Sequence, residues 1–105
     1  MIIRLWRGRT PLDKAAAYEA FMIERAGPDY SSVAGLRAFY FTRRDLPEWA
    51  EFLLITHWDS VEAIKQFAGE DYDTAKYYPE DQDFLLDFPE HVEHFEVFDT
   101  RMIEG

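Results

Sequence analysis

Residues 52–64 read Phe-Leu-Leu-Ile-Thr-His-Trp-Asp-Ser-Val-Glu-Ala-Ile and change period part-way. The first seven are apolar at nearly consecutive positions, which is typical of a strand buried on both faces. Asp59 or Ser60 can then cap a helix with a side-chain oxygen. The apolar residues that follow fall on one helical face: Val61, Ile64, Phe67 and Ala68. We therefore predict a buried strand over 52–58 followed by a helix.

The chain before this strand predicts a strand, a helix and a second strand. Residues 2–9 are rich in apolar side chains and favour a strand. Residues 10–13, Thr-Pro-Leu-Asp, supply a capping hydroxyl, a proline at the first helical position and an acid in the first turn. The helix should end at 26, because Gly and Pro follow. Residues 36–43 are aromatic and predict the next strand.

The last third of the chain predicts a long acidic connection and a closing strand. Residues 75–78 favour a ragged helical stretch, and residues 79–86 a short helix that begins with proline. Residues 92–98 have the composition of a strand. The aromatic segment 70–90 is long for a connection, so we interpret it as a lid over a cavity or as an arm around a partner subunit.

The predicted order is strand, helix, strand, strand, helix, strand. This is the split βαβ arrangement of ferredoxin-like α+β domains, in which both helices cover one face of an antiparallel sheet. The other face would remain open, although its strands are apolar. A second copy of the same sheet is the economical cover for a chain of this length. We therefore expect a homodimer formed through the open sheet face.

Composition describes one globular domain over residues 1–105, with 48% hydrophobic and 30% charged residues. The formal net charge of −10 disfavours nucleic acids and anionic membranes as partners. The charge is uneven, with eight basic and four acidic residues in 1–44 against three and seventeen in 45–105. There is no cysteine, no membrane-length apolar run and no signal-like N-terminus, so we expect a cytoplasmic protein without disulfides or thiolate ligands.

The chain resembles the antibiotic biosynthesis monooxygenase (ABM) domain family of the dimeric α/β-barrel superfamily. Residues 52–64 carry the likeness, with a strand ending in Trp58, a polar cap and an Ala-bearing helix. The Gly-Leu-Arg approach at 35–37 and the closing His-Phe-Glu-Val at 94–97 are similar too. The resemblance implies a ferredoxin-like domain that dimerises as an α/β barrel. Its members include cofactor-free oxygenases of polycyclic phenols and haem-degrading oxygenases.

Neither a haem nor a metal ion is expected. The haem-degrading members have an iron-binding helical histidine shortly after the Trp-bearing strand, whereas residues 71–77 contain none and Tyr77 lies nearest that place. The asparagine of their first strand is also missing. His57 and His94 could meet across neighbouring strands, but two hydrogen-bonded histidines are a more economical interpretation than a metal site.

The candidate site combines bases with aromatic walls. His57 or His94 could deprotonate a phenol, because imidazole titrates near neutral pH, and Tyr77 supplies a phenolic hydroxyl. By the resemblance, Trp58 faces a cavity between the sheet and the second helix, where it could stack on a planar substrate; the alternative is a core tryptophan. Further candidates for substrate binding are Tyr40, Trp6 and Arg7.

The leading functional hypothesis is a cofactor-independent monooxygenase of a small planar aromatic or quinol-like compound. It follows from the resemblance, because the substrate anion itself activates dioxygen and needs only a dry pocket with hydrogen-bond donors. Two alternatives remain open. One is a non-catalytic small-molecule-binding or structural homodimer, and the other is an isomerase or decarboxylase that uses a histidine. A glycine-rich phosphate loop and a serine nucleophile have no support in the sequence.

Overall fold

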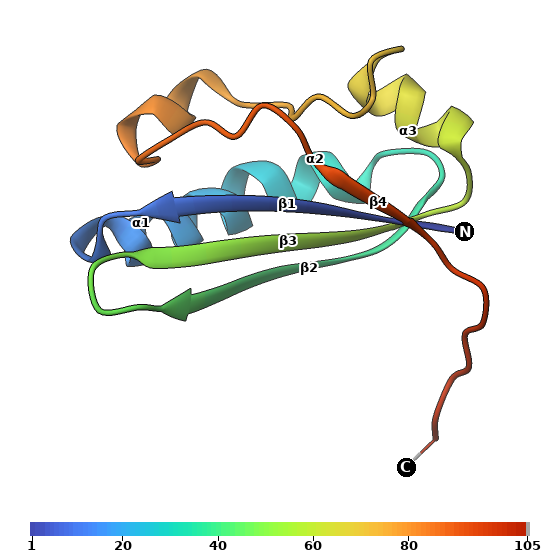
Figure 1. The fold of residues 1–105 in the computed structure, drawn as a ribbon, viewed down its shortest axis with the longest axis horizontal. Helices are drawn as coiled ribbons and strands as arrows, with labels where there is room; N and C mark the ends of the chain where they lie inside the picture. The colour runs from blue at the N-terminus through green and yellow to red at the C-terminus, as the bar shows by residue number, and fades with distance from the viewer. Residues whose placement is uncertain (105) are drawn as a thin grey trace.

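A four-stranded antiparallel sheet forms the centre of the molecule, which is a computed structural model describing residues 1–104. The spatial order of the strands is β2-β3-β1-β4. Their bounds are β1 Ile2–Thr10, β2 Leu36–Asp45, β3 Ala50–Trp58 and β4 Glu93–Glu96. All three neighbouring pairs are antiparallel, and the long helical run lies against one face (Figure 1). The ferredoxin-like α+β fold is thereby confirmed.

One continuous helical run links β1 to β2. It consists of a 3-10 turn Leu12–Lys14, α1 Ala15–Phe21, a π-helical turn Met22–Ala26 and α2 Gly27–Ser31. The predicted end at residue 26 is therefore wrong. The amide of Gly27 donates to the carbonyl of Met22, five residues back. This wider turn accommodates the ring of Pro28, which would clash with the preceding turn of a regular α-helix.

The second helix begins as predicted. It is α3, Val61–Ala68, and Ser60 is its N-cap. The Ser60 hydroxyl accepts a hydrogen bond from the amide of Ala63 at 3.2 Å. Phe67 packs on Trp58 with ring centroids 5.3 Å apart, so the last side chain of β3 and the last turn of α3 share one aromatic contact.

The side chains of β3 alternate strictly between buried and half-exposed. Buried Phe52 and Leu54 belong to the core cluster that includes residues of α1, whereas Leu53 and Ile55 face the open side of the sheet. The predicted burial of both faces is therefore wrong for the single chain. The helices cover one face only, and the apolar odd-numbered residues of β3 have no cover within residues 1–104.

Residues 70–92, which we call the cover segment, run back along the β1 side of the sheet (Figure 1). The helical stretch predicted at 75–78 is wrong. Tyr78 is extended, with φ −86° and ψ 151°, because the ring of the following Pro79 disfavours the helical conformation.

The cover segment lies against its own chain. The helix predicted over 79–86 is shorter, a 3-10 turn Pro79–Asp83. Phe84 packs on Tyr18 of α1 with ring centroids 5.2 Å apart, and the amide of Leu86 donates to the carbonyl of Arg9. The segment therefore packs on α1 and on the end of β1 of its own chain.

The chain leaves the sheet after β4. The closing strand ends at residue 96 rather than at 98, and the tail points away from the domain (Figure 1). The Phe98 side chain is 99% exposed, and Met102 and Ile103 are nearly as exposed. Within residues 1–104 no helix is long and apolar enough to cross a membrane.

Candidate functional site

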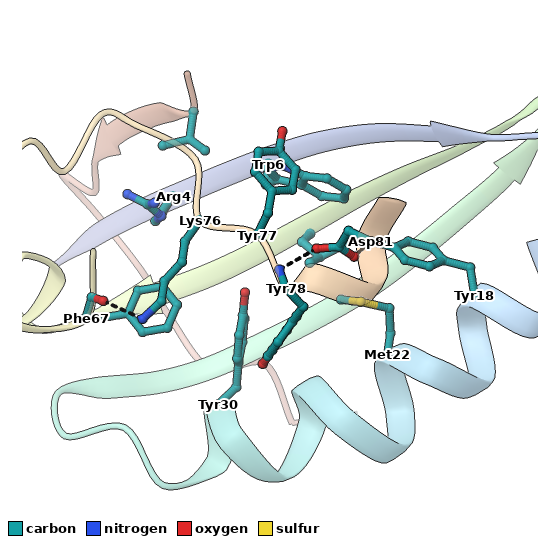
Figure 2. Close-up of a pocket in the computed structure, with 12 residues that line it drawn as sticks. Arg4, Trp6, Tyr18, Met22, Tyr30, Phe67, Lys76, Tyr77, Tyr78 and Asp81 are labelled. Carbon is teal, nitrogen blue, oxygen red and sulfur yellow. Dashed lines mark hydrogen bonds between the residues drawn. The ribbon is translucent and has the colours of Figure 1, made fainter. Parts of the chain in front are cut away.

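A small cavity of about 40 Å³ lies between β1, the helical run and the cover segment. We call it the inner cavity (Figure 2). Half of its twelve lining residues are aromatic, namely Trp6, Tyr18, Tyr30, Phe67, Tyr77 and Tyr78, and its charged lining groups are Arg4, Lys76 and Asp81. A cavity of this size has room for about three water molecules.

A wider cleft of about 280 Å³ adjoins the inner cavity on the side of α2. We call it the outer cleft. Five residues line both spaces: Tyr30, Phe67, Lys76, Tyr77 and Tyr78. The Nζ of Lys76 donates a hydrogen bond to the carbonyl of Phe67 at 3.0 Å and lies 4.6 Å from the centre of the Phe67 ring. These contacts hold Lys76 between the two spaces. Side chains of the cover segment thus line both spaces.

Trp6 is positioned by the glycine two residues later on the same face of β1. A Cβ atom at Gly8 would lie 2.1 Å from the Trp6 ring, so only glycine lets the indole lie along the strand. The indole Nε1 donates to the hydroxyl of Tyr77 at 3.3 Å, and that hydroxyl donates to the carbonyl of Pro89. Trp6 and Tyr77 therefore form a fixed polar and aromatic corner of the inner cavity.

Arg4 is a buried cation, only 6% exposed. Its guanidinium donates to the carbonyls of Tyr72 and Thr74, and its Nη1 lies 3.0 Å from Nε2 of His94. No ion pair between residues 1–104 involves Arg4. Burial lowers the pKa of Arg4, although a guanidinium stays protonated in proteins. A full positive charge therefore lies at the cavity wall without a carboxylate in contact.

The imidazole of His94, on the neighbouring strand β4, contacts the guanidinium of Arg4. Because Arg4 can only donate, Nε2 of His94 must accept, and the ring proton lies on Nδ1. Nδ1 is 3.1 Å from Oδ1 of Asp73, which accepts it. Burial, and then the charge of Arg4, lower the pKa of His94. The geometry therefore corresponds to a neutral imidazole that orients Arg4.

Asp81 is the buried carboxylate of the inner cavity, 3% exposed. The hydroxyl of Tyr18 donates to its Oδ1 at 3.1 Å, and the amide of Tyr78 donates to its Oδ2 at 2.7 Å. Burial raises the pKa of Asp81, and these two hydrogen bonds only partly oppose that effect. Asp81 is thus a carboxyl group whose basicity is increased by an aromatic environment.

The structure brings three of the sequence-predicted site residues to the cavity side of the sheet. Trp6 and Tyr77 line the inner cavity, and His94 reaches it through Arg4. Trp58 is completely buried and lines a void of about 20 Å³ whose other lining residues include Arg4, Trp6 and Tyr30 of the inner cavity. Its Nε1 donates to the hydroxyl of Thr56 at 2.8 Å. Trp58 therefore lies in the core, beside the inner cavity.

The other three lie on the opposite face. His57 pairs with Ile3 in the register of the sheet, and the Tyr40 ring packs on His57 at a tilt, with ring centroids 5.7 Å apart. Arg7 is on the same face, paired with Glu93 at 3.1 Å. The expectation that His57 and His94 meet across neighbouring strands is wrong, because β1 lies between β3 and β4. Side chains that point to opposite faces of a sheet cannot line the same cavity.

Arg4, Tyr30, Lys76 and Asp81 were missed by the sequence analysis. A signal existed for Arg4, since it lies two residues from Trp6 and therefore on the same face of its strand. Tyr30 is edge-on to Phe67 with centroids 5.5 Å apart, and burial raises its pKa to about 12. Asp81 lies two residues after Pro79, at a place where an acid normally serves as a helix cap. Its burial depends on the packing of the cover segment.

Several solved structures have a fold similar to that of this chain. No family model matches the chain, and no curated protein is significantly similar in sequence. A protein from Bacillus cereus, provisionally named an antibiotic biosynthesis monooxygenase, is 14% identical with a TM-score of 0.62 over 100% of this chain and 98% of that one. The chain shares the fold of this protein. A protein of unknown function from Nitrosomonas europaea is 15% identical (TM-score 0.63; 99% and 96% covered).

A third similar structure is a point mutant of MhuD with two manganese protoporphyrin IX molecules bound per active site. It is 16% identical, with a TM-score of 0.61 and 100% of both chains covered. The residues of the present cavity do not fit a haem. Both ring nitrogens of His94 are engaged, and the Tyr77 hydroxyl is bonded to Trp6 and to the backbone. His94 and Tyr77 are therefore not free to ligate haem iron, and a cavity of about 40 Å³ has no room for a porphyrin.

Proposed function

We propose that this chain is a cofactor-independent monooxygenase of a small planar phenol or hydroquinone bound in the inner cavity. The observation that carries the proposal is Asp81, a buried carboxylate in a cavity of whose lining residues half are aromatic. Such a group is a suitable general base for a phenol, because burial brings its pKa closer to neutral pH. Trp6 and Tyr77 would hold the ring of the substrate. The similarity of fold to ABM-like proteins supports the same reaction class.

The proposed reaction consumes one dioxygen and needs a phenol or hydroquinone with a hydrogen-bearing carbon ortho or para to its hydroxyl. Asp81 takes the phenolic proton, and the resulting anion forms a carbon–oxygen bond with dioxygen at that carbon. The peroxide receives the proton back from Asp81. Loss of the C–H proton and cleavage of the O–O bond then give a quinone carbonyl and one water. One oxygen atom is thus incorporated and the other is reduced, with all electrons supplied by the substrate.

Substrate access requires the cover segment to move. The inner cavity is far below the several hundred Å³ of ordinary ligand pockets, while the outer cleft of about 280 Å³ approaches that size. Outward displacement of Lys76 and Tyr77 would join the two spaces. The small volume of the inner cavity favours the second candidate, a binding or structural protein whose cavity is filled by its own aromatic side chains.

Oxygen consumption by the purified protein tests the proposal. A panel of polycyclic phenols and hydroquinones is supplied without added cofactor, and the product is analysed after labelling with ¹⁸O₂. We expect protein-dependent uptake of one dioxygen per substrate and one labelled oxygen atom in the product. Uptake at the spontaneous rate across the whole panel would contradict the oxygenase and leave the binding protein as the better candidate.

We also propose that a second copy of the chain covers the open sheet face. Apolar side chains meet at its centre, where Leu5 and Tyr40 are both register partners of Ile55. Tyr40 is 54% exposed and Phe95 nearly as much, although both are large. An apolar sheet face of this kind is an unusual surface for a monomer, and self-association through a two-fold axis would bury it in both copies.

Replacing Ile55 with Asp should convert a dimer into a monomer. The new carboxylate would lie at the centre of the paired faces, where burying an unpaired charge costs more than the contact contributes. Sedimentation equilibrium measures the mass. The matched control is Ile23→Asp, because Ile23 is 68% exposed on the helical run. A wild-type chain that sediments as a monomer, or an Ile55→Asp variant that stays dimeric, would refute this arrangement.

A further inference from the structure

We infer that the ligand of the inner cavity is a planar aromatic compound with a hydroxyl at one end and an ionised oxygen at the other, and that Arg4 binds the ionised oxygen. The inference rests on the proposed function for the identity of the site. It adds the substrate class. The ionised oxygen could belong to a carboxylate or to a second, acidic phenol.

The buried guanidinium of Arg4 needs an anion as a partner. A guanidinium has five N–H donors, and two backbone carbonyls and one imidazole nitrogen use three of them. Two donors therefore have no acceptor among residues 1–104. A buried cation is expensive unless an anion neutralises it, and a planar carboxylate or phenolate oxygen is the partner that a guanidinium fits best.

The surroundings of Arg4 do not supply that anion. Asp73 raises the pKa of Arg4 only from a distance, since His94 lies between the two. The imidazole is neutral, so it orients the guanidinium without compensating its charge. Lys76 adds a second cation to the same wall. The deep end of the inner cavity is therefore electropositive, in contrast to a chain with a net charge of −10.

Asp81 lies at the other end of the inner cavity and can accept a proton there. Figure 2 shows Arg4 toward one end of the cavity and Asp81 toward the other, with Tyr77 between them. A compound that spans this space meets a cation at one end and a proton acceptor at the other. The aromatic walls require the part between them to be flat and apolar. A hydroxylated aromatic acid and a hydroquinone monoanion both meet these conditions.

Equilibrium binding separates this inference from the oxygenase, because it is measured without oxygen. Isothermal titration calorimetry compares naphthoate, naphthol and naphthalene, which share one ring system, with a hydroxynaphthoate substituted at opposite ends. We expect naphthoate and hydroxynaphthoate to bind wild-type protein at least tenfold more tightly than naphthalene. Arg4→Met should weaken naphthoate binding about 30-fold or more and change naphthalene binding less than threefold.

Two further variants control the experiment. Arg4→Lys keeps the charge but not the planar fork, so it should retain part of the preference for naphthoate even if Arg4→Met folds poorly. Arg101→Met removes an exposed arginine from the C-terminal tail and should leave binding unchanged. Naphthol binding that strengthens with pH and is lost in Arg4→Met would identify a phenolate as the source of the anion.

The outcomes distinguish the two proposals. Equal affinities of naphthoate and naphthalene for wild-type protein, or naphthoate binding unaffected by Arg4→Met, would overturn the anion site while leaving the oxygenase intact. Binding of none of these compounds would overturn both the anion site and the inner cavity as a ligand site.

Discussion

Replacing Asp81 with Asn is expected to lower protein-dependent oxygen uptake about 100-fold or more, the usual contribution of a general base. The amide cannot accept the phenolic proton, although it has nearly the shape of the carboxyl group. Asp83→Asn is the matched control, because Asp83 lies on the same 3-10 turn but is exposed. Its rate should equal that of the wild type. Circular dichroism and substrate titration establish that both variants fold and bind.

The pH dependence of the rate provides a second test of Asp81. The base acts in its ionised form, so the rate should rise as the pH increases through the pKa of Asp81. Burial raises that pKa, and the rise should therefore occur above the usual carboxyl range. Asp81→Asn should abolish this step and Asp83→Asn should retain it. An Asp81→Asn variant with the wild-type rate and pH profile would show that another group takes the proton.

Replacing Trp58 with Ala is expected to lower the free energy of unfolding by about 3–5 kcal/mol, the usual cost of emptying a buried tryptophan site. The indole is fully buried, packs on Phe67 and donates to the hydroxyl of Thr56. Since small domains are stable by about 5–15 kcal/mol, this loss is a large part of the total. Denaturant unfolding followed by circular dichroism measures it.

The control for this substitution is Ile23→Ala, which removes a large apolar side chain from an exposed position of the helical run. We expect it to change the free energy of unfolding by less than about 0.5 kcal/mol. Trp58→Phe should be intermediate, because it keeps one aromatic ring but loses the second ring of the indole and the N–H donor. A Trp58→Ala variant within about 1 kcal/mol of the wild type would argue against the core position and return Trp58 to the list of candidate substrate contacts.

Local sequence signals predicted most of the elements. The cap at Ser60 and the apolar spacing after it place α3 correctly, because capping and helical periodicity depend on residues within one or two turns. The end of the first helix was mispredicted because Pro28 normally ends a helix, and only the π-helical turn before it makes room for the ring. The extended residues 75–78 were mispredicted because Pro79 and packing on the sheet outweigh local helix propensity.

The candidate site was predictable only in part. The aromatic residues Trp6 and Tyr77 could be proposed from their type and from the resemblance. The prediction that His57 and His94 meet was wrong, because the sequence does not show which strand lies between them or which face of the sheet each side chain takes. Asp81 reads as an ordinary helix cap until the cover segment folds back and buries it under Tyr18.

The sequence by itself determined the ferredoxin-like order of elements and an apolar sheet with one face left to cover, because periodicity and turn chemistry are local properties. Only the tertiary structure decided which charges are buried and which face each strand presents to the cavity. Arg4 and Asp81 become a cation and a base facing the same small space through contacts between residues about seventy positions apart. The chemistry of this site is therefore a consequence of packing, since burial and pairing set the basicity of both groups.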